Sequence, residues 1–133
     1  MFLLCLLSLF GHLVKGSITD CSNGASLFSV RSMSFSPDPM VQGQNSTLRL
    51  SLLVPQTITD GTATYTVTYN FFPLTPTVNP LCTTTVPCPI TPGILDTYSS
   101  YPPTGLSGSM QIRIIWKDGT GKQLLCINIK TGV

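Results

Sequence analysis

The 133-residue sequence contains no glutamate and a single histidine, His12, and only 9% of its residues are charged. General acid–base and nucleophilic catalysis usually rely on histidine, glutamate or a nucleophile held beside a base. The acidic residues are five scattered aspartates. Asp–Asp and Ser–Lys arrangements stay open on sequence alone, although no motif points to them. We therefore expect a protein that is not an enzyme and that needs no cofactor or metal.

Basic residues are sparse too, with seven Lys and Arg against five Asp, and the formal net charge of the whole chain is +2. Proteins that bind nucleic acid usually carry a basic patch or stripe. Nothing in this sequence resembles one. We expect no nucleic-acid partner.

The N-terminus begins with an apolar run, residues 1–10. A helix that spans a bilayer takes about 20 apolar residues, so this run is too short for one. It is typical of a secretory signal, with small-residue cleavage near Gly16, although no Lys or Arg precedes it. We predict a signal peptide at residues 1–16 and one domain at residues 17–133, secreted or held in the endosomal, lysosomal or vacuolar lumen. An uncleaved anchor and a buried first strand are the alternatives.

Several segments alternate between apolar and polar side chains with a period of two, which predicts β-strands. The clearest runs from Thr62 to Phe71, where Ala63, Tyr65, Val67, Tyr69 and Phe71 share one face. Similar alternation predicts strands over 48–52, 110–116 and 125–130. A fifth strand is predicted over 27–35, without an assignment of its inward face. No ten-residue run has helical periodicity with caps. The pattern favours an all-β sandwich or barrel.

Two turns and one irregular stretch complete this prediction. Asp118-Gly119 lies inside a short segment, Lys117–Lys122, that is typical of a hairpin between two strands. Residues 55–61 predict a second turn. Most of the eleven prolines lie between Pro73 and Pro103, and we expect a long irregular segment there.

Four cysteines remain outside the predicted signal: Cys21, Cys82, Cys88 and Cys126. Only Cys82 and Cys88 are close, their spacing is unusual for zinc, and the predicted domain has no histidine. The Cys-x-x-Cys pattern of redox sites is absent. An even number of cysteines in a short secreted chain indicates disulfides. Three pairings are allowed, and we favour Cys82–Cys88 with Cys21–Cys126, because the ends of a sandwich chain can be neighbours.

Several short segments of the predicted domain follow one another in a recognisable order and spacing. They are Asp20-Cys21-Ser-Asn-Gly24, Ser36-Pro37, Gly43-x-Asn45, Cys82-x5-Cys88-Pro89-Ile90, Asp96-Thr-Tyr98-Ser and Trp116-x-Asp118-x2-Gly121-Lys122-x3-Cys126. In these segments the sequence resembles the ML family, the MD-2-related lipid-recognition domains, which include Niemann–Pick type C2 sterol carriers and phosphatidylglycerol/phosphatidylinositol transfer proteins. One departure is that Ser36-Pro-Asp38-Pro lacks the cysteine that the family often has there, together with its partner.

The resemblance implies an immunoglobulin-like β-sandwich of two antiparallel sheets with an apolar cavity between them. It implies that Phe72-Pro73-Leu74 lies at the cavity mouth and that Tyr101-Pro102 flanks the pocket. Ordinary core packing is the competing interpretation for the Tyr65–Phe71 face and for Trp116. The candidate cavity residues are Tyr65, Val67, Tyr69, Phe71, Phe72, Leu74, Tyr98, Tyr101, Leu106, Met110, Ile112 and Ile114.

We expect a monomeric lipid-binding or lipid-transfer protein that buries a sterol or a phospholipid acyl chain. A lipid-recognition or small-hydrophobe-binding module that acts with a receptor is the alternative, and a closed structural sandwich is a third. Contact with a membrane surface or a receptor follows from the first two. Asn45-Ser46-Thr47 is a sequon for N-glycosylation, so a glycan at Asn45 is expected unless the triplet is unused.

Overall fold

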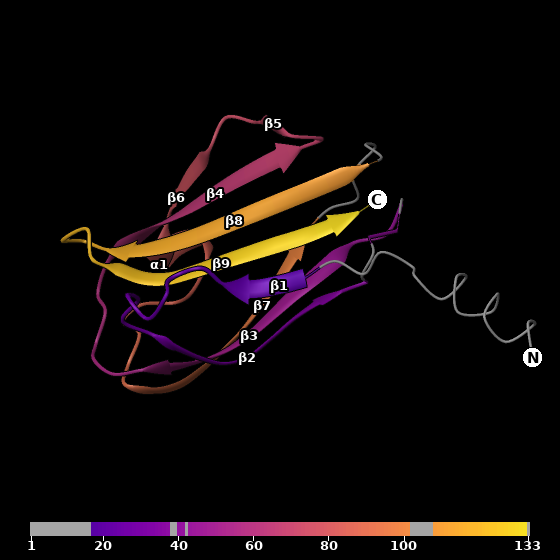
Figure 1. The fold of residues 1–133 in the computed structure, drawn as a ribbon. Helices are drawn as coiled ribbons and strands as arrows, with labels where there is room; N and C mark the ends of the chain where they lie inside the picture. The colour runs from indigo at the N-terminus through magenta and orange to yellow at the C-terminus, as the bar shows by residue number, and fades with distance from the viewer. Residues whose placement is uncertain (1–16, 38–39, 42, 102–107, 133) are drawn as a thin grey trace, which may run out of the picture.

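The computed structural model describes residues 17–37, 40–41, 43–101 and 108–132, and these residues form a pair of antiparallel sheets that lie as two layers (Figure 1). The larger sheet has the strand order β1-β9-β8-β4-β5, and β6 also pairs with β4. Its strands are β1 (Ser17–Asp20), β4 (Gly61–Tyr69), β5 (Phe72–Pro73), β6 (Thr77–Pro80), β8 (Ser109–Asp118) and β9 (Gln123–Gly132).

The smaller sheet has the order β2-β3-β7, and β7 therefore forms one of its free edges. Its strands are β2 (Ser29–Ser36), β3 (Ser46–Val54) and β7 (Gly93–Tyr101), and a short helix α1 (Leu81–Thr84) follows β6. No helix among the described residues is long and apolar enough to span a membrane. The predicted all-β class with two antiparallel sheets is confirmed.

The core lies between the two layers because each strand sends alternate side chains inward. On β3 the buried positions are Leu48, Leu50 and Leu52, and the residues between them are half-buried or exposed. On β8 the buried positions include Ile112, Ile114 and Trp116, and the residues between them are half-buried or exposed. Since successive side chains of a strand point to opposite faces, this pattern fixes the pairing register.

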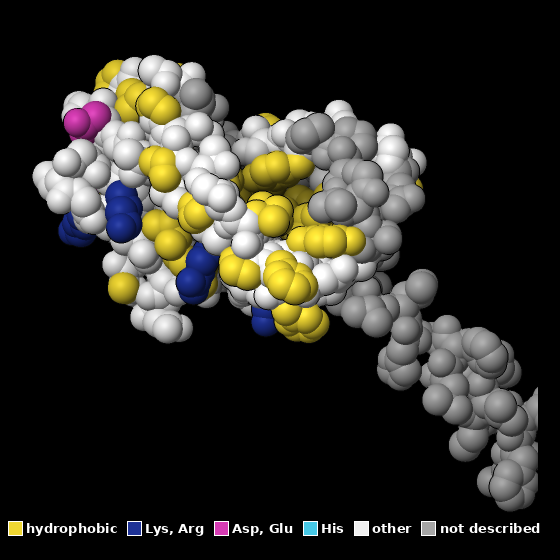
Figure 2. All heavy atoms as spheres, turned by 90° about the horizontal axis from the view of Figure 1, so that it is seen from above, with side chains coloured by type: hydrophobic (Ala, Val, Ile, Leu, Met, Phe, Trp, Pro, Cys, Tyr) yellow, Lys and Arg dark blue, Asp and Glu magenta, His cyan; other side chains and the backbone are white. Residues whose placement is uncertain are grey.

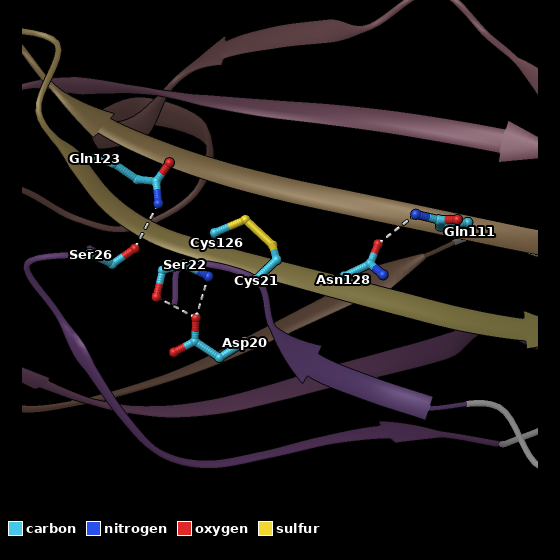
Figure 3. The surroundings of a disulfide bond; sticks show 8 residues. All are labelled: Asp20, Cys21, Ser22, Ser26, Gln111, Gln123, Cys126 and Asn128. Carbon is cyan, nitrogen blue, oxygen red and sulfur yellow. Dashed lines mark hydrogen bonds between the residues drawn. A yellow bond between two sulfur atoms is a disulfide. The ribbon is translucent and has the colours of Figure 1, made fainter. Parts of the chain in front are cut away.

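One disulfide joins residues that are far apart in the sequence and a second joins residues that are close. Their pairing is the one that the sequence analysis favoured. Cys21 pairs with Cys126, with the two Cα atoms 5.1 Å apart, so the segment after β1 is bonded to β9 (Figure 3). Next to it, the Asp20 carboxylate accepts hydrogen bonds from the backbone N–H and the hydroxyl of Ser22. Cys82, which lies in α1, pairs with Cys88 and closes a short loop at the end of that helix.

Two expectations need correction. The strand predicted over 62–71 ends at Tyr69, because Asn70 and Phe71 have φ angles of 45° and 69° and form a turn into β5. The segment between Pro73 and Pro103 is less irregular than its composition suggested, since it contains β6, α1 and β7. Proline is tolerated in β5 and β6 because both are edge strands, where a missing N–H need not break a ladder.

Candidate functional site

A cavity of about 700 Å³ lies between the two sheets, at the side where β7 faces β4, β6 and the end of α1. Figure 2 shows a hollow in the surface seen from above, with hydrophobic side chains gathered in and around it. Ligand pockets typically measure roughly 300–1,000 Å³. The cavity is therefore large enough for a small lipid-like molecule.

The inner wall of the cavity comes from the larger sheet. Val67 on β4 and Ile112 on β8 are paired in register, and Tyr65 precedes Val67 on the same inward face. Ile112 is buried, and Tyr65 and Val67 are half-buried against the core. Two regular strands therefore present a continuous wall of aliphatic and aromatic surface.

The side of the cavity formed by β6 and α1 is polar. Thr77 and Asn79 alternate on β6 and pair in register with Tyr65 and Ala63 of β4, so both face inward. Thr85 follows α1 and also lines the cavity. Sequence reasoning missed these three residues, because they lie in the proline-rich stretch that was expected to be irregular. The available signal was the i, i+2 spacing of Thr77 and Asn79, which places both side chains on one face of a strand.

The opposite side of the cavity is the edge strand β7. Four consecutive residues line it, Tyr98, Ser99, Ser100 and Tyr101. Tyr98 is 71% exposed and stands at the rim, where the Arg49 guanidinium lies 5.3 Å from its ring centroid. Ser99 and Ser100 were not predicted, and their position beside Tyr98 on an edge strand is what brings them to the rim.

Tyr101 lies deeper than Tyr98 and packs against Phe35, with ring centroids 6.2 Å apart. Its hydroxyl is enclosed and has no hydrogen-bond partner among the described residues. Burial, together with the nearby Tyr65 phenol, raises the pKa of Tyr101 above the ordinary value of a tyrosine. The phenol therefore stays protonated at physiological pH and is available as a hydrogen-bond donor.

The cavity lining contains no charged side chain within the described segments of the chain. Burying a charge without a partner is costly, whereas neutral polar groups can be accommodated by single hydrogen bonds. The cavity is therefore suited to hydrocarbon and neutral oxygen groups, with any charged group left outside.

The structure brings together five of the twelve predicted cavity residues as lining: Tyr65, Val67, Tyr98, Tyr101 and Ile112. Met110 and Ile114 are buried in the core, and Tyr69 packs against that core, but none of these three is among the lining residues. Leu106 lies outside the described residues.

The remaining predicted residues form an exposed apolar tip at the turn from β4 to β5. Phe71 is 91% exposed, Phe72 74% and Leu74 47%, and Val78 on β6 is exposed as well. They lie outside the cavity lining because the left-handed backbone at Asn70 and Phe71 turns the chain outward after Tyr69. We call Phe71, Phe72 and Leu74 the apolar tip. The sequon residue Asn45 is exposed just before β3.

A two-layer sandwich with a hollow between its sheets defines a class of small β-proteins that can enclose a hydrophobic molecule. The family model described as the ML domain matches residues 15–133, which is most of the chain. The protein belongs to the ML domain family.

Relatives of known sequence are similar over most of the chain. A putative phosphatidylglycerol/phosphatidylinositol transfer protein 1 of Dictyostelium discoideum is 25% identical over 118 residues, which cover 86% of this chain and 78% of the relative. The putative transfer protein 3 of the same organism is 24% identical over 119 residues, covering 86% and 79%.

Solved structures share the fold at lower identity. A Niemann–Pick type C2 protein from the Japanese carpenter ant superposes with a TM-score of 0.69 at 12% identity, over 87% of this chain and 98% of that one. Chicken MD-1 complexed with lipid IVa superposes with a TM-score of 0.64 at 13% identity, over 88% of both chains. These similarities show the β-sandwich fold.

Proposed function

We propose that this protein binds one lipid molecule in the cavity between its sheets and transfers it between membranes. The observation that carries the proposal is the cavity of about 700 Å³, walled by Val67, Ile112 and Tyr65 and open at a rim that includes the exposed Tyr98. Burial of each methylene of a lipid chain is worth about 0.8 kcal/mol. An open, partly polar cavity allows release as well as binding.

Phospholipid is the ligand class that the surroundings of the cavity favour. The uncharged lining suits an acyl chain, and a charged phosphate stays outside it. The names of the Dictyostelium relatives, putative phosphatidylglycerol/phosphatidylinositol transfer proteins, agree with this choice.

The apolar tip supports transfer over simple storage. Phe71 contributes nothing to the core, since it is 91% exposed, and it adopts a left-handed backbone that favours glycine. A large aromatic side chain in such a place is suited to contact with a lipid surface. A receptor surface is the competing partner, in keeping with a recognition module that does not transport its lipid.

Secretion into an oxidising compartment belongs to this proposal. Disulfides persist in secreted and lumenal proteins and are rare in the cytosol. The two disulfides of the described chain, and the signal-like first 16 residues, support this location. The protein acts by binding, without catalysis, as a monomer.

Native mass spectrometry of the oxidised protein from a secreting host tests lipid binding. We expect a bound mass at one molecule per chain that organic extraction releases as phospholipid. A released sterol would change the ligand class within the same function. A bare protein that also refuses phosphatidylglycerol, phosphatidylinositol and sterol supplied in vesicles would overturn the proposal.

A further inference from the structure

The phenol of Tyr101 is a buried hydrogen-bond donor without an acceptor. Its oxygen is enclosed and has no partner among the described residues, while other atoms of Tyr101 line the cavity, so a ligand reaches the oxygen only when the side chains around it shift. Buried polar side chains nearly always have a partner in the protein or in ordered water, and an exception in a native structure calls for an explanation. A group that a ligand brings into the cavity is one such explanation.

A second hydroxyl at the same end of the smaller sheet is also unpaired. Ser46 is the register partner of Tyr101 across β3 and β7, it is fully buried, and its Oγ has no partner within the described chain. Ser46 does not line the cavity, so it does not itself make the site. It shows that hydrogen-bonding capacity is left unmet at this end of the interior.

The chemistry of the surroundings limits what the acceptor can be. Tyr101 is a donor that stays protonated, because burial raises its pKa. The uncharged lining, with Val67 and Ile112 on the inner wall, offers no counter-charge to a phosphate or a carboxylate. A neutral oxygen carried on a hydrocarbon, such as a hydroxyl or an ester carbonyl, fits both conditions.

We propose that Tyr101 selects lipids that carry a neutral oxygen acceptor inside the cavity, by donating a hydrogen bond from its phenol to that oxygen. This inference rests on the proposed lipid-binding function and adds the class of group that the cavity recognises. The tail alone is not the recognised feature: of two ligands with the same hydrocarbon, the one with the buried oxygen binds more tightly.

A matched pair of ligands and a matched pair of variants test this selection. 1-Dodecanol and dodecane differ by one oxygen, and their affinities are measured by displacement of the fluorescent probe N-phenyl-1-naphthylamine. Tyr101→Phe removes the phenol oxygen and keeps the ring. Tyr69→Phe is the control, because Tyr69 lies on the inward face of β4 but not among the cavity-lining residues.

The expected result is a loss of selectivity confined to one variant. Tyr101→Phe weakens dodecanol binding by about tenfold, the value of one neutral hydrogen bond, and leaves dodecane binding unchanged. Tyr69→Phe keeps the wild-type preference for dodecanol. If Tyr101 had only a structural role, Tyr101→Phe would lower the affinity for both ligands equally. That result would contradict the inference.

Other outcomes separate this inference from the function on which it rests. Equal dodecanol affinity in wild type and Tyr101→Phe, with both ligands bound, overturns the role of the phenol and leaves lipid binding intact. If the wild-type protein binds neither ligand and no lipid in native mass spectrometry, the proposed function fails and the inference fails with it.

Discussion

Among individual residues, Asp118 shows how one carboxylate organises the hairpin between β8 and β9. Its Oδ1 accepts hydrogen bonds from the Thr120 hydroxyl at 2.6 Å and from the backbone N–H groups of Thr120 and Lys122, each at 2.9 Å. The bond from the Thr120 hydroxyl is the largest cause that lowers the pKa of Asp118, followed by the backbone bonds and the charge of Lys122. Sequence predicted this turn from Asp-Gly alone, without the carboxylate's role.

The hairpin is therefore expected to loosen at low pH. Because the folded-state pKa of Asp118 lies below its unfolded value, its stabilisation is present above the ordinary aspartate pKa and is lost as pH falls through the lowered folded value. An NMR titration from neutral to strongly acidic pH should give a carboxyl midpoint below the ordinary aspartate value, with lower protection of the Thr120 and Lys122 amides, relative to their intrinsic exchange rates, below it. Asp118→Asn, which keeps an acceptor oxygen, should remove this pH dependence. A midpoint at or above the ordinary value would contradict the account.

Tyr101→Phe should not destabilise the protein in the absence of ligand. The ring packs against Phe35 in either form, and the hydroxyl that is lost has no partner within the described residues. We expect the free energy of unfolding in urea to stay the same or to rise by about 1 kcal/mol, since an unpaired buried polar group is removed. Leu52→Ala, at a fully buried position of β3, is the comparison and should cost about 2–5 kcal/mol. A clear decrease in the free energy of unfolding of Tyr101→Phe would mean that the phenol makes a structural hydrogen bond, and would contradict this prediction.

At the level of secondary structure, the sequence predicted the long central strands and missed the short edge elements. Period-two alternation is strong in β3 and β8 because one face of each is buried and the other is not, and the sequence of β4 alternates as well, although most of its residues are half-buried. β6 and α1 have four residues each, too few for a pattern to be visible among prolines. Three of the ten lining residues, Thr77, Asn79 and Thr85, come from these segments and escaped prediction, whereas Val67 and Ile112 on the long strands did not.

The two disulfides should contribute unequally to stability. Cys21–Cys126 spans 105 residues and Cys82–Cys88 only 6. In the chain-entropy model a loop of ~100 residues is worth about 4.7 kcal/mol, and the short loop about 2 kcal/mol. Urea unfolding of the two double serine variants should therefore show the larger loss for Cys21→Ser with Cys126→Ser. The reverse order would mean that α1 and its loop depend on Cys82–Cys88 for more than loop closure.

Considered as a whole, the molecule places its cavity and its apolar tip on neighbouring strands. β4 contributes Tyr65 and Val67 to the cavity wall and then turns, at Asn70 and Phe71, into the exposed apolar tip. β6 pairs with β4 and carries the cavity residue Thr77. A surface that contacts a membrane through the tip thus lies beside the cavity that receives the lipid. The resemblance placed Phe72 and Leu74 at the cavity mouth. Alternation placed Phe71 on the inward face of the strand, because the pattern continues past the point where the backbone turns.

Removal of the apolar tip should therefore separate lipid transfer from lipid binding. In the double variant Phe71→Gly with Phe72→Ser, we expect transfer of fluorescent phosphatidylglycerol between vesicles to slow by roughly tenfold or more, since burial of one phenylalanine in the bilayer is worth about 1.5–3 kcal/mol. The unfolding free energy should not fall, because glycine adopts the φ of 69° at residue 71 without strain. Native mass spectrometry should still detect one lipid per chain, since neither residue lines the cavity.

The control for this experiment is Ile94→Ser, which removes a 60% exposed apolar side chain from β7 at the start of that strand, away from the tip. Its transfer rate should stay at the wild-type level, because Ile94 pairs with Leu53 of the smaller sheet and belongs to neither the tip nor the cavity lining. Equal slowing by both variants would indicate a general effect of surface hydrophobicity. Unchanged transfer in the double tip variant would remove the tip from the mechanism, and a receptor would then become the favoured acceptor of the lipid.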